Sequence, residues 1–369
     1  MAASMQRKRP RLDWTLVAPV LALAVALALK GSSAPLGGAG LALALLAAVL
    51  AAVHHAEVVA ARVGDPFGAV VLALAVTVIE LGLIVSIMLG PHPEPTLVRD
   101  TIHAVVILVL HGLAGLCIVV AAIRHHEGQF RTEGALAYLI VLLPMVAITL
   151  VLPNFTTSAP GPFYTGPQLG FVSAACLLLW LAFTFIQTVR HREHFMPVVS
   201  LAGDEGDDSH EGHGPRPGAA EAALAVAMLA VALVAVVLAA KGVSPFLQSG
   251  VERLGAPTAL VGVIVAAIVL MPEALTALRA ARQDRLQTSI NIALGSAVAS
   301  IGLTVPTIAV IAWATGIRLE LGVSPRDAVL LVLSFMMAII TYGTGRASLL
   351  SGVVHLILMA TWLFLVVAP

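Results

Sequence analysis

The chain has 369 residues, of which 59% are hydrophobic and 11% are charged, and its 20 basic and 20 acidic residues cancel. Soluble domains carry about 25% charged residues, so this chain has too little polar surface to cover a water-facing globule. The composition therefore predicts a polytopic membrane protein with the lipid bilayer as a partner. Zero net charge gives no reason to expect a nucleic acid as a partner. Cys117 and Cys176 lie in apolar stretches and predict neither a disulfide framework nor a metal cluster.

The N-terminal region contains a basic cluster and an apolar run from about 15 to 29, which Lys30 and the sequence GSSAP (31–35) follow. This order is compatible with a cleaved signal peptide. Lys30 and the missing A-x-A cleavage site favour instead a first membrane helix that the protein keeps.

The apolar runs are long enough to predict an all-α bundle, because a spanning helix needs about 20 mostly apolar residues. Lipid forbids unpaired backbone groups, and these runs lack the alternation of barrel strands. About eleven spans are expected, at 15–30, 37–62, 67–89, 100–123, 135–152, 167–189, 219–240, 257–281, 286–313, 326–342 and 346–367.

The placement of Lys and Arg predicts the orientation of these spans. With the N-terminus in the cytoplasm, fourteen of the 20 basic residues fall on the cytoplasmic side and six on the opposite side. The same topology places the polar segment 191–218 in the cytoplasm. That segment carries the acids and histidines His191, His194, Asp204, Glu205, Asp207, Asp208, His210, Glu211 and His213. Its Gly, Pro and charge content favours a solvated linker, with a weak cation-concentrating or regulatory loop as the alternative.

Two acids lie deep in apolar segments at matching positions. AVVLALAVTVIEL (69–81) aligns with GVIVAAIVLMPEA (262–274), which places Glu80 opposite Glu273. A charged residue at the centre of a bilayer costs at least about 2.5–3.5 kcal/mol and usually marks an ion or proton pathway. The alternative for each acid is a protonated carboxyl group that is hydrogen-bonded to a neighbouring helix.

Five crossings separate Glu80 from Glu273, so the second unit is expected to run upside down relative to the first. This arrangement predicts a tail and first helix (1–33), a five-helix repeat (34–190), the cytoplasmic loop (191–218) and an inverted five-helix repeat (219–369). Transporters with inverted repeats place their site near the midplane, between the halves. Two close carboxylates in a low dielectric do not both stay ionised cheaply. Either a cation or protons relieve the repulsion, and this competition is the physical basis of antiport.

Neighbouring groups are expected to support the pair. Pro272 frees the carbonyl of Ile268 as a potential oxygen ligand, although an ordinary proline kink is the alternative. Thr77 and Thr276 lie three residues from the acids on the same helix faces. Their hydroxyls could serve the site, or bond back to their own helices.

The first repeat contains the pattern E-x6-G-x3-G-x11-E, as Glu57, Gly64, Gly68 and Glu80. The second repeat, residues 251–306, has a Gly-Ser pair after its glutamate, as Gly295 and Ser296. These features resemble the calcium/cation–proton exchangers of the cation/calcium exchanger superfamily, and most of all the bacterial sodium/calcium–proton antiporters. The resemblance spans residues 40–369.

The resemblance implies a secondary antiporter, not an enzyme, that exports Ca²⁺, Na⁺ or K⁺ in exchange for protons without a cofactor. It implies that Glu80 and Glu273 are the exchange carboxylates that hold the metal ion. It also implies that Gly295 and Ser296 line the site, with Ser300 one turn further on. A bacterial cytoplasmic membrane is then the expected location. The oligomeric state stays open, a homo-oligomer included.

The sequence departs from the family where a Gly-Asn dipeptide precedes each glutamate. Val76-Thr77 and Val269-Leu270 stand there instead. Fewer side-chain oxygens disfavour an all-protein calcium cage and favour a site that also accepts sodium or potassium. His111 lies in LVLHGLAG (108–115), where the second repeat has IALGSAVAS. It is expected to be either a proton-responsive neighbour of the pair or a structural histidine, and His355 is expected to be structural.

Three further acids near helix ends are expected either to line entry and exit vestibules or to be solvated. They are Glu57, Glu221 and Glu252. The sequence KGVSP (241–245) is expected to break the seventh helix. The chain contains neither H-E-x-x-H nor G-x-x-x-x-G-K-[ST], which gives no support to an intramembrane metalloprotease or to ATP-driven transport. A cation channel or uniporter is the remaining alternative, although an internal inverted repeat suits alternating access better.

Overall fold

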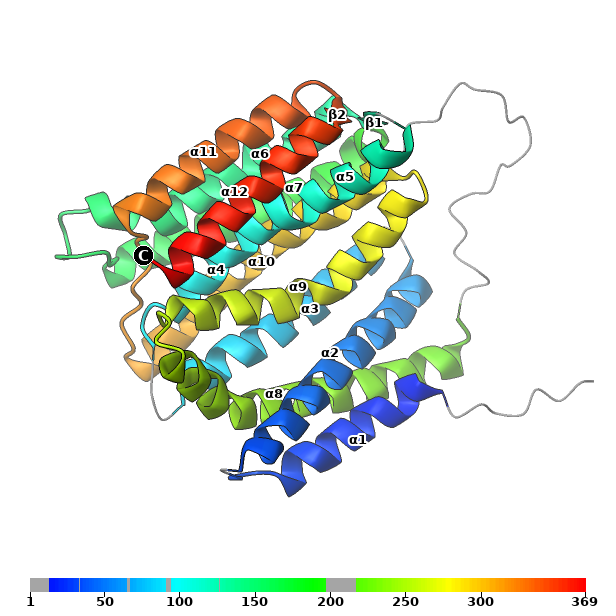
Figure 1. Cartoon of the computed structure of the whole chain (residues 1–369). Coiled ribbons are helices and arrows are strands. Elements are labelled where there is room, and N and C mark those ends of the chain that lie inside the picture. The colour runs from blue at the N-terminus through cyan, green and yellow to red at the C-terminus, as the bar shows by residue number, and fades with distance from the viewer. Residues whose placement is uncertain (1–12, 33, 65–66, 91–93, 126, 197–216) are drawn as a thin grey trace, which may run out of the picture.

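The computed structural model describes residues 13–32, 34–64, 67–90, 94–125, 127–196 and 217–369. The basic N-terminal cluster and most of the acidic loop, including His210 and His213, lie outside the described residues. The chain is almost entirely helical (Figure 1).

The helices follow the apolar segments of the sequence. In chain order they are α1 Trp14–Ala28, α2 Pro35–Val63, α3 Phe67–Met88, α4 Leu97–Ile107, α5 Ala114–His125, α6 Thr132–Val146, α7 Gly166–Phe185, α8 Ala219–Arg253, α9 Ala259–Arg282, α10 Leu286–Thr315, α11 Pro325–Tyr342 and α12 Leu349–Val367. A π-helical turn, η1 (Leu108–Leu113), joins α4 and α5 into one span. Another, η4 (Ile186–Arg190), extends α7. In the described part of the chain, 10 helical segments are long and apolar enough to cross a membrane.

The predicted first span is a helix but a short one. α1 has 15 residues, which corresponds to about 22 Å of helix against a hydrocarbon core of about 30 Å. α1 packs along α2 and α8 (Figure 1). His55 Nε2 on α2 lies 2.9 Å from the carbonyl oxygen of Thr15, which ties the two helices together. The first of the 10 helical segments that are long enough to cross a membrane is therefore α2.

The predicted break at KGVSP is wrong. α8 is one helix of 35 residues that continues through Pro245. A proline removes one helical hydrogen bond, but neighbouring helices in a bundle can compensate for that loss. Here α8 packs against α1 and α2 along much of its length, so the surrounding contacts hold the helix together.

Small residues permit close packing between α2 and α8. Ala48 and Ala52 on α2 and Ala235 on α8 are completely buried. A Cβ atom at Gly38 would lie 2.7 Å from the ring of Phe246, and one at Gly242 would lie 2.9 Å from Leu41. Without a hydrophobic force between helices in lipid, such close backbone approach supplies much of the association energy. In Figure 1, α1, α2 and α8 form one side of the molecule, and α6, α7, α11 and α12 lie beyond α3 and α9.

Loops that were expected on the same side of the membrane meet in the structure. Strand β1 (Glu127–Gln129) pairs antiparallel with β2 (Arg346–Ser348), next to the ends of α5 and α11. At the opposite end, Phe163 and Glu320 form an isolated antiparallel bridge. We name the end at which α7 stops and α8 begins the connector end, and the opposite one the far end.

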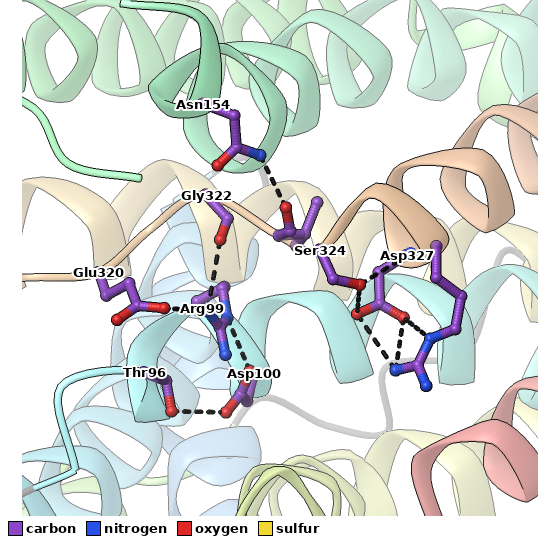
Figure 2. A network of polar contacts seen from close by, with 10 residues as sticks. Thr96, Arg99, Asp100, Asn154, Glu320, Gly322, Ser324 and Asp327 are labelled. Atoms are coloured by element: carbon purple, nitrogen blue, oxygen red, sulfur yellow. Dashed lines mark hydrogen bonds and ion pairs between the residues drawn. The ribbon is translucent and has the colours of Figure 1, made fainter. Parts of the chain in front are cut away.

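At the far end, a cluster of charged and polar groups connects neighbouring helix ends and loops (Figure 2). Arg99 Nη1 donates to Glu320 Oε1 at 2.6 Å, and Arg99 Nε donates to Asp100 Oδ1 at 2.8 Å. Thr96 Oγ1 lies 2.8 Å from the second carboxylate oxygen of Asp100. Close by, Asn154 Nδ2 donates to the carbonyl oxygen of Val323 at 2.7 Å. These contacts join the start of α4 and the end of the span Thr132–Phe155 to the loop between α10 and α11.

Candidate ion-exchange site

A cavity of about 230 Å³ lies between α3, α7, α9 and α10. The residues that line it include Glu80, Glu273, Thr184, Gln187 and Asn291. The last three residues lie where α7 ends and α10 begins, so the cavity leads from the glutamates toward the connector end. It is large enough for several water molecules.

Glu80 is 1% exposed, and its partner comes from another helix. The Ser300 hydroxyl on α10 lies 2.7 Å from Oε1 and 2.8 Å from Oε2 of the Glu80 carboxyl group, so its one proton is shared between them. Thr304 lies one turn further along α10, is completely buried and is close enough to the Glu80 carboxyl group for its hydroxyl to interact with it. A hydrogen bond to a charged group is worth about 1.5–3 kcal/mol, so Ser300 fixes the position of Glu80.

Glu273 lies on α9 and is half-buried. Its Oε2 atom is shielded from solvent and has no hydrogen-bond partner in the described part of the chain. The carboxylate is close enough to those of Glu80 and Glu57 for electrostatic repulsion. A buried carboxylate oxygen without a partner is costly, and a cation or a proton at this position would remove the cost.

The predicted supporting residues divide into two groups. Thr77, Gly295 and Ser296 line the cavity together with Glu80, Glu273 and Ser300. Thr77 Oγ1 donates to the Ala73 carbonyl at 2.8 Å, which leaves the lone pairs of its oxygen available.

Thr276 and Pro272 lie outside this lining. The Thr276 side chain is exposed, and its Oγ1 donates to the Pro272 carbonyl oxygen at 3.0 Å. Thr276 therefore follows the alternative in which the hydroxyl bonds back to its own helix. Pro272 is buried inside α9, which continues past it to Arg282.

His111 lies on η1 but does not line the cavity. Its Nδ1 atom lies 2.7 Å from Nδ1 of His355 on α12, and His355 Nε2 lies 3.0 Å from Thr341 Oγ1. One ring must donate and the other accept across so short a distance. The contact therefore pairs the two histidines with each other rather than with the glutamates.

The three vestibule candidates occupy different surfaces. Glu57 is exposed near the end of α2, where its carboxylate interacts electrostatically with Arg279 and with Glu273. Glu252 lines a separate groove of about 1000 Å³ between α1 and α8. Glu221 is exposed in the first turn of α8. Of the three, Glu57 is the one that interacts with the glutamate pair.

The sequence prediction missed the polar residues at the connector end of the cavity, namely Thr184, Gln187, Thr188 and Asn291. Gln187 Nε2 donates to the Tyr138 hydroxyl at 2.7 Å, and Asn291 Nδ2 donates to the Phe195 carbonyl at 2.6 Å. A signal for Asn291 was present, because it lies four residues before Gly295 on the same helix face. No comparable spacing marked the residues on α7.

A profile of the family described as "Sodium/calcium exchanger protein" matches residues 15–189 and 224–368. The chain belongs to this family. The resemblance that the glutamates and glycines indicated is thereby confirmed, and the protein is a transporter rather than an enzyme.

Two relatives of this exchanger cover most of its length. The Putative ionic transporter y4hA of Sinorhizobium fredii (strain NBRC 101917 / NGR234) is 42% identical over 326 residues, which are 88% of this chain and 87% of the relative. The Sodium-potassium/proton antiporter ChaA of Escherichia coli (strain K12) is 34% identical over 364 residues, 96% of each chain.

Solved structures confirm the exchanger fold. The structure of native YfkE matches with a TM-score of 0.72 and 16% identity, and covers 96% of this chain and 100% of its own. The H⁺/Ca²⁺ exchanger CAX matches with a TM-score of 0.68 and 14% identity, over 96% of this chain and 89% of its own. The all-α membrane architecture is therefore that of a cation exchanger.

Proposed function

We propose that this exchanger is a secondary antiporter that moves Na⁺, K⁺ or Ca²⁺ out of the cytoplasm in exchange for protons, by alternating access at Glu80 and Glu273. The observation that carries the proposal is that Glu273 Oε2 has no hydrogen-bond partner among the described residues, while the Glu273 carboxylate shares one cavity with that of Glu80 and is close enough for repulsion. An inorganic cation or protons can satisfy this arrangement, but not both at once.

Exclusion of one ion by the other couples the two fluxes. With a cation bound, the positive charge offsets both carboxylates and protonation becomes unfavourable. With protons bound, the carboxyl groups are neutral and hold a cation poorly. A carrier that changes access only in these two loaded states exchanges one ion for the other.

Access in this conformation is from the connector end. The cavity reaches Gln187 and Asn291 there, whereas the Arg99 cluster fastens the far end (Figure 2). The distribution of basic residues supports a cytoplasmic N-terminus and connector end, in a bacterial cytoplasmic membrane. Inverted repeats over 34–190 and 219–369 would supply the second, outward-open arrangement.

The chemistry of the cavity favours a monovalent cation. Calcium takes six to eight oxygen ligands. Beside the two carboxylates, the lining includes the hydroxyls of Thr77 on α3 and of Ser296 and Ser300 on α10, and the Ser300 hydroxyl contacts Glu80. A relative that is 34% identical carries the name Sodium-potassium/proton antiporter, which supports sodium and potassium as substrates here.

Proteoliposomes with an imposed pH gradient and a trapped pH indicator test the proposal. Adding Na⁺, K⁺ or Ca²⁺ to one side should dissipate the gradient, and competition among the three ranks the cations. A cation channel is the alternative, and it would pass cations without a reciprocal proton flux. Cation movement that is indifferent to the pH gradient would therefore overturn antiport.

A further inference from the structure

The turn that follows α7 brings three metal-ligating side chains together. Ligand atoms of His191, Glu193 and His194 all lie within 4.8 Å of one another. Glu193 Oε1 is 3.3 Å from His191 Nδ1 and 3.8 Å from His194 Nε2. The two imidazole rings are stacked, with centroids 5.1 Å apart and planes 11° apart. This grouping uses none of the residues of the glutamate pair.

The distances suit a first-row transition metal. Zinc binds imidazole nitrogen and carboxylate oxygen at about 2.0–2.2 Å in a tetrahedron, so its ligand atoms lie about 3.4 Å apart. The two distances from Glu193 are close to this value. All three side chains are partly or fully exposed, so the rings can tilt toward an ion and water can fill the fourth position.

The backbone under these side chains is held in place by contacts with the helix bundle. Asn291 Nδ2 donates to the Phe195 carbonyl at 2.6 Å, and Arg131 Nε donates to the Met196 carbonyl at 3.1 Å. Gly134 on α6 lies so close to the His194 carbonyl that a Cβ atom there would clash with it. Residues 191–194 therefore need little ordering when they bind an ion, which favours affinity.

The side chain of Glu193 also suits a cation, because carboxylate oxygen is an ordinary zinc ligand beside imidazole nitrogen.

We propose that His191, Glu193 and His194 form a binding site for a Zn²⁺-class transition metal at the mouth of the cavity. Two imidazole nitrogens and one carboxylate oxygen are the ligands, and water completes the shell. Hard cations such as sodium prefer all-oxygen sites, so this site is chemically distinct from the exchange site.

The site lies between two segments of the cavity wall. Gln187 and Thr188 line the cavity four and three residues before His191, and Asn291 both lines the cavity and holds Phe195. A metal ion that ties His191 to His194 stiffens this part of the wall. We therefore expect bound Zn²⁺ to slow exchange, an expectation that rests on the proposed antiport.

Calorimetric titration of the purified full-length protein with Zn²⁺ tests the site. We expect one Zn²⁺ per chain at this site and a loss of affinity of about tenfold or more in His191→Ala, His194→Ala and Glu193→Gln. Losing even an outer-shell partner of a metal ligand typically costs 10–100-fold. Arg192→Ala is the matched control in the same turn, and it should bind like the wild type.

Two further controls separate other sources of binding. His210→Ala/His213→Ala removes the remaining histidines of the loop, and Glu80→Gln/Glu273→Gln removes the carboxylates of the exchange site. Both double variants should keep the wild-type affinity. The proposal is overturned if His191→Ala and His194→Ala bind Zn²⁺ like the wild type, or if the loss of affinity appears in either double variant instead. Equal thermal unfolding temperatures show that the variants are folded.

Transport provides an independent measurement. Zn²⁺ on the connector side should slow proton-coupled cation flux in the wild type and in Arg192→Ala, but not in His191→Ala. Unchanged flux with Zn²⁺ bound would refute the predicted slowing and leave the metal site standing. Zn²⁺ binding without any exchange activity would instead count against the proposed antiport.

Discussion

Glu80 and Glu273 align in the two halves of the sequence, but their surroundings differ. Glu80 is 1% exposed and both of its carboxylate oxygens lie within hydrogen-bonding distance of Ser300. Glu273 is half-buried, and its Oε2 has no partner among the described residues. Two acids at matching positions of the sequence therefore differ: the Glu80 carboxylate is held by a hydroxyl from another helix, and the Glu273 carboxylate keeps one oxygen without a partner among the described residues.

The difference arises in the helices that face the acids. α10 presents Ser300 to Glu80, whereas the corresponding span of the first half contributes Val105 to the cavity, a residue without a side-chain oxygen. When His111 is aligned with Gly295, Leu116 stands opposite Ser300, and its side chain is 40% exposed on the outer surface. We infer that Glu80 positions the ion and that Glu273 provides the carboxylate oxygen that exchanges cation and proton.

The strongest test of this comparison removes one charge at a time. Glu80→Gln and Glu273→Gln should each reduce proton-coupled cation flux in proteoliposomes to the level of empty vesicles, because one carboxylate alone leaves too little charge to bind the cation against protons. Both variants should stay folded, since glutamine fills nearly the same volume. Full activity in either variant would contradict the role of the pair.

Removing the partner of Glu80 should have the next largest effect. Ser300→Ala deletes a hydrogen bond worth about 1.5–3 kcal/mol to a charged group, so the cation concentration for half-maximal flux should rise about tenfold or more. Ser300→Thr keeps the hydroxyl and should recover much of the loss. Ser296→Ala is a control at a lining position whose hydroxyl makes no hydrogen bond to either acid in the described part of the chain. An equal effect of both alanine variants would argue against a specific role for Ser300.

The two threonines beside the acids test the difference between the halves directly. Thr77 lines the cavity and Thr276 does not. Thr77→Val should raise the half-maximal cation concentration about threefold, in line with loss of roughly one neutral polar contact. Thr276→Val should leave the half-maximal cation concentration unchanged. A larger effect at Thr276 than at Thr77 would contradict the conclusion that Thr77 is the threonine that serves the site.

The substitution with the smallest expected effect adds a side-chain oxygen at a position where the first half of the chain lacks one. Val105→Thr introduces a hydroxyl at the cavity wall with little change in volume. We expect the half-maximal cation concentration to fall about twofold, because cations of this class prefer oxygen ligands. Val105→Ala, which adds no oxygen, is the control, and an equal fall in that variant would show that space rather than chemistry is responsible.

Hydropathy and spacing were sufficient to predict the helices and the two deep acids, whereas the residues of α10 in the cavity lining were predicted from the family resemblance. Long apolar runs in lipid have few alternatives to helix, so the spans from α2 to α12 follow from the sequence. The resemblance supplied Gly295 and Ser296, and helical spacing placed Ser300 one turn further along the same face.

The remaining features depend on packing between helices, which local sequence does not encode. Thr276 has the same spacing from its acid as Thr77, but its side of α9 is exposed. His111 faces α12, and its partner His355 is 244 residues away. α8 continues through Pro245 because α1 and α2 support it, and neither contact has a signature within the KGVSP segment.

With the orientation and the alternating access that we propose, the Arg99 cluster at the far end would link exchange to the composition of the external medium. The contact between Arg99 and Glu320 would then have to separate before the glutamates become accessible from that side. The two side chains are 19% and 28% exposed, so dissolved ions reach them and weaken their attraction. Higher salt concentration outside the cell would then favour the outward-open conformation by screening this ion pair, which lies outside the residues that line the cavity.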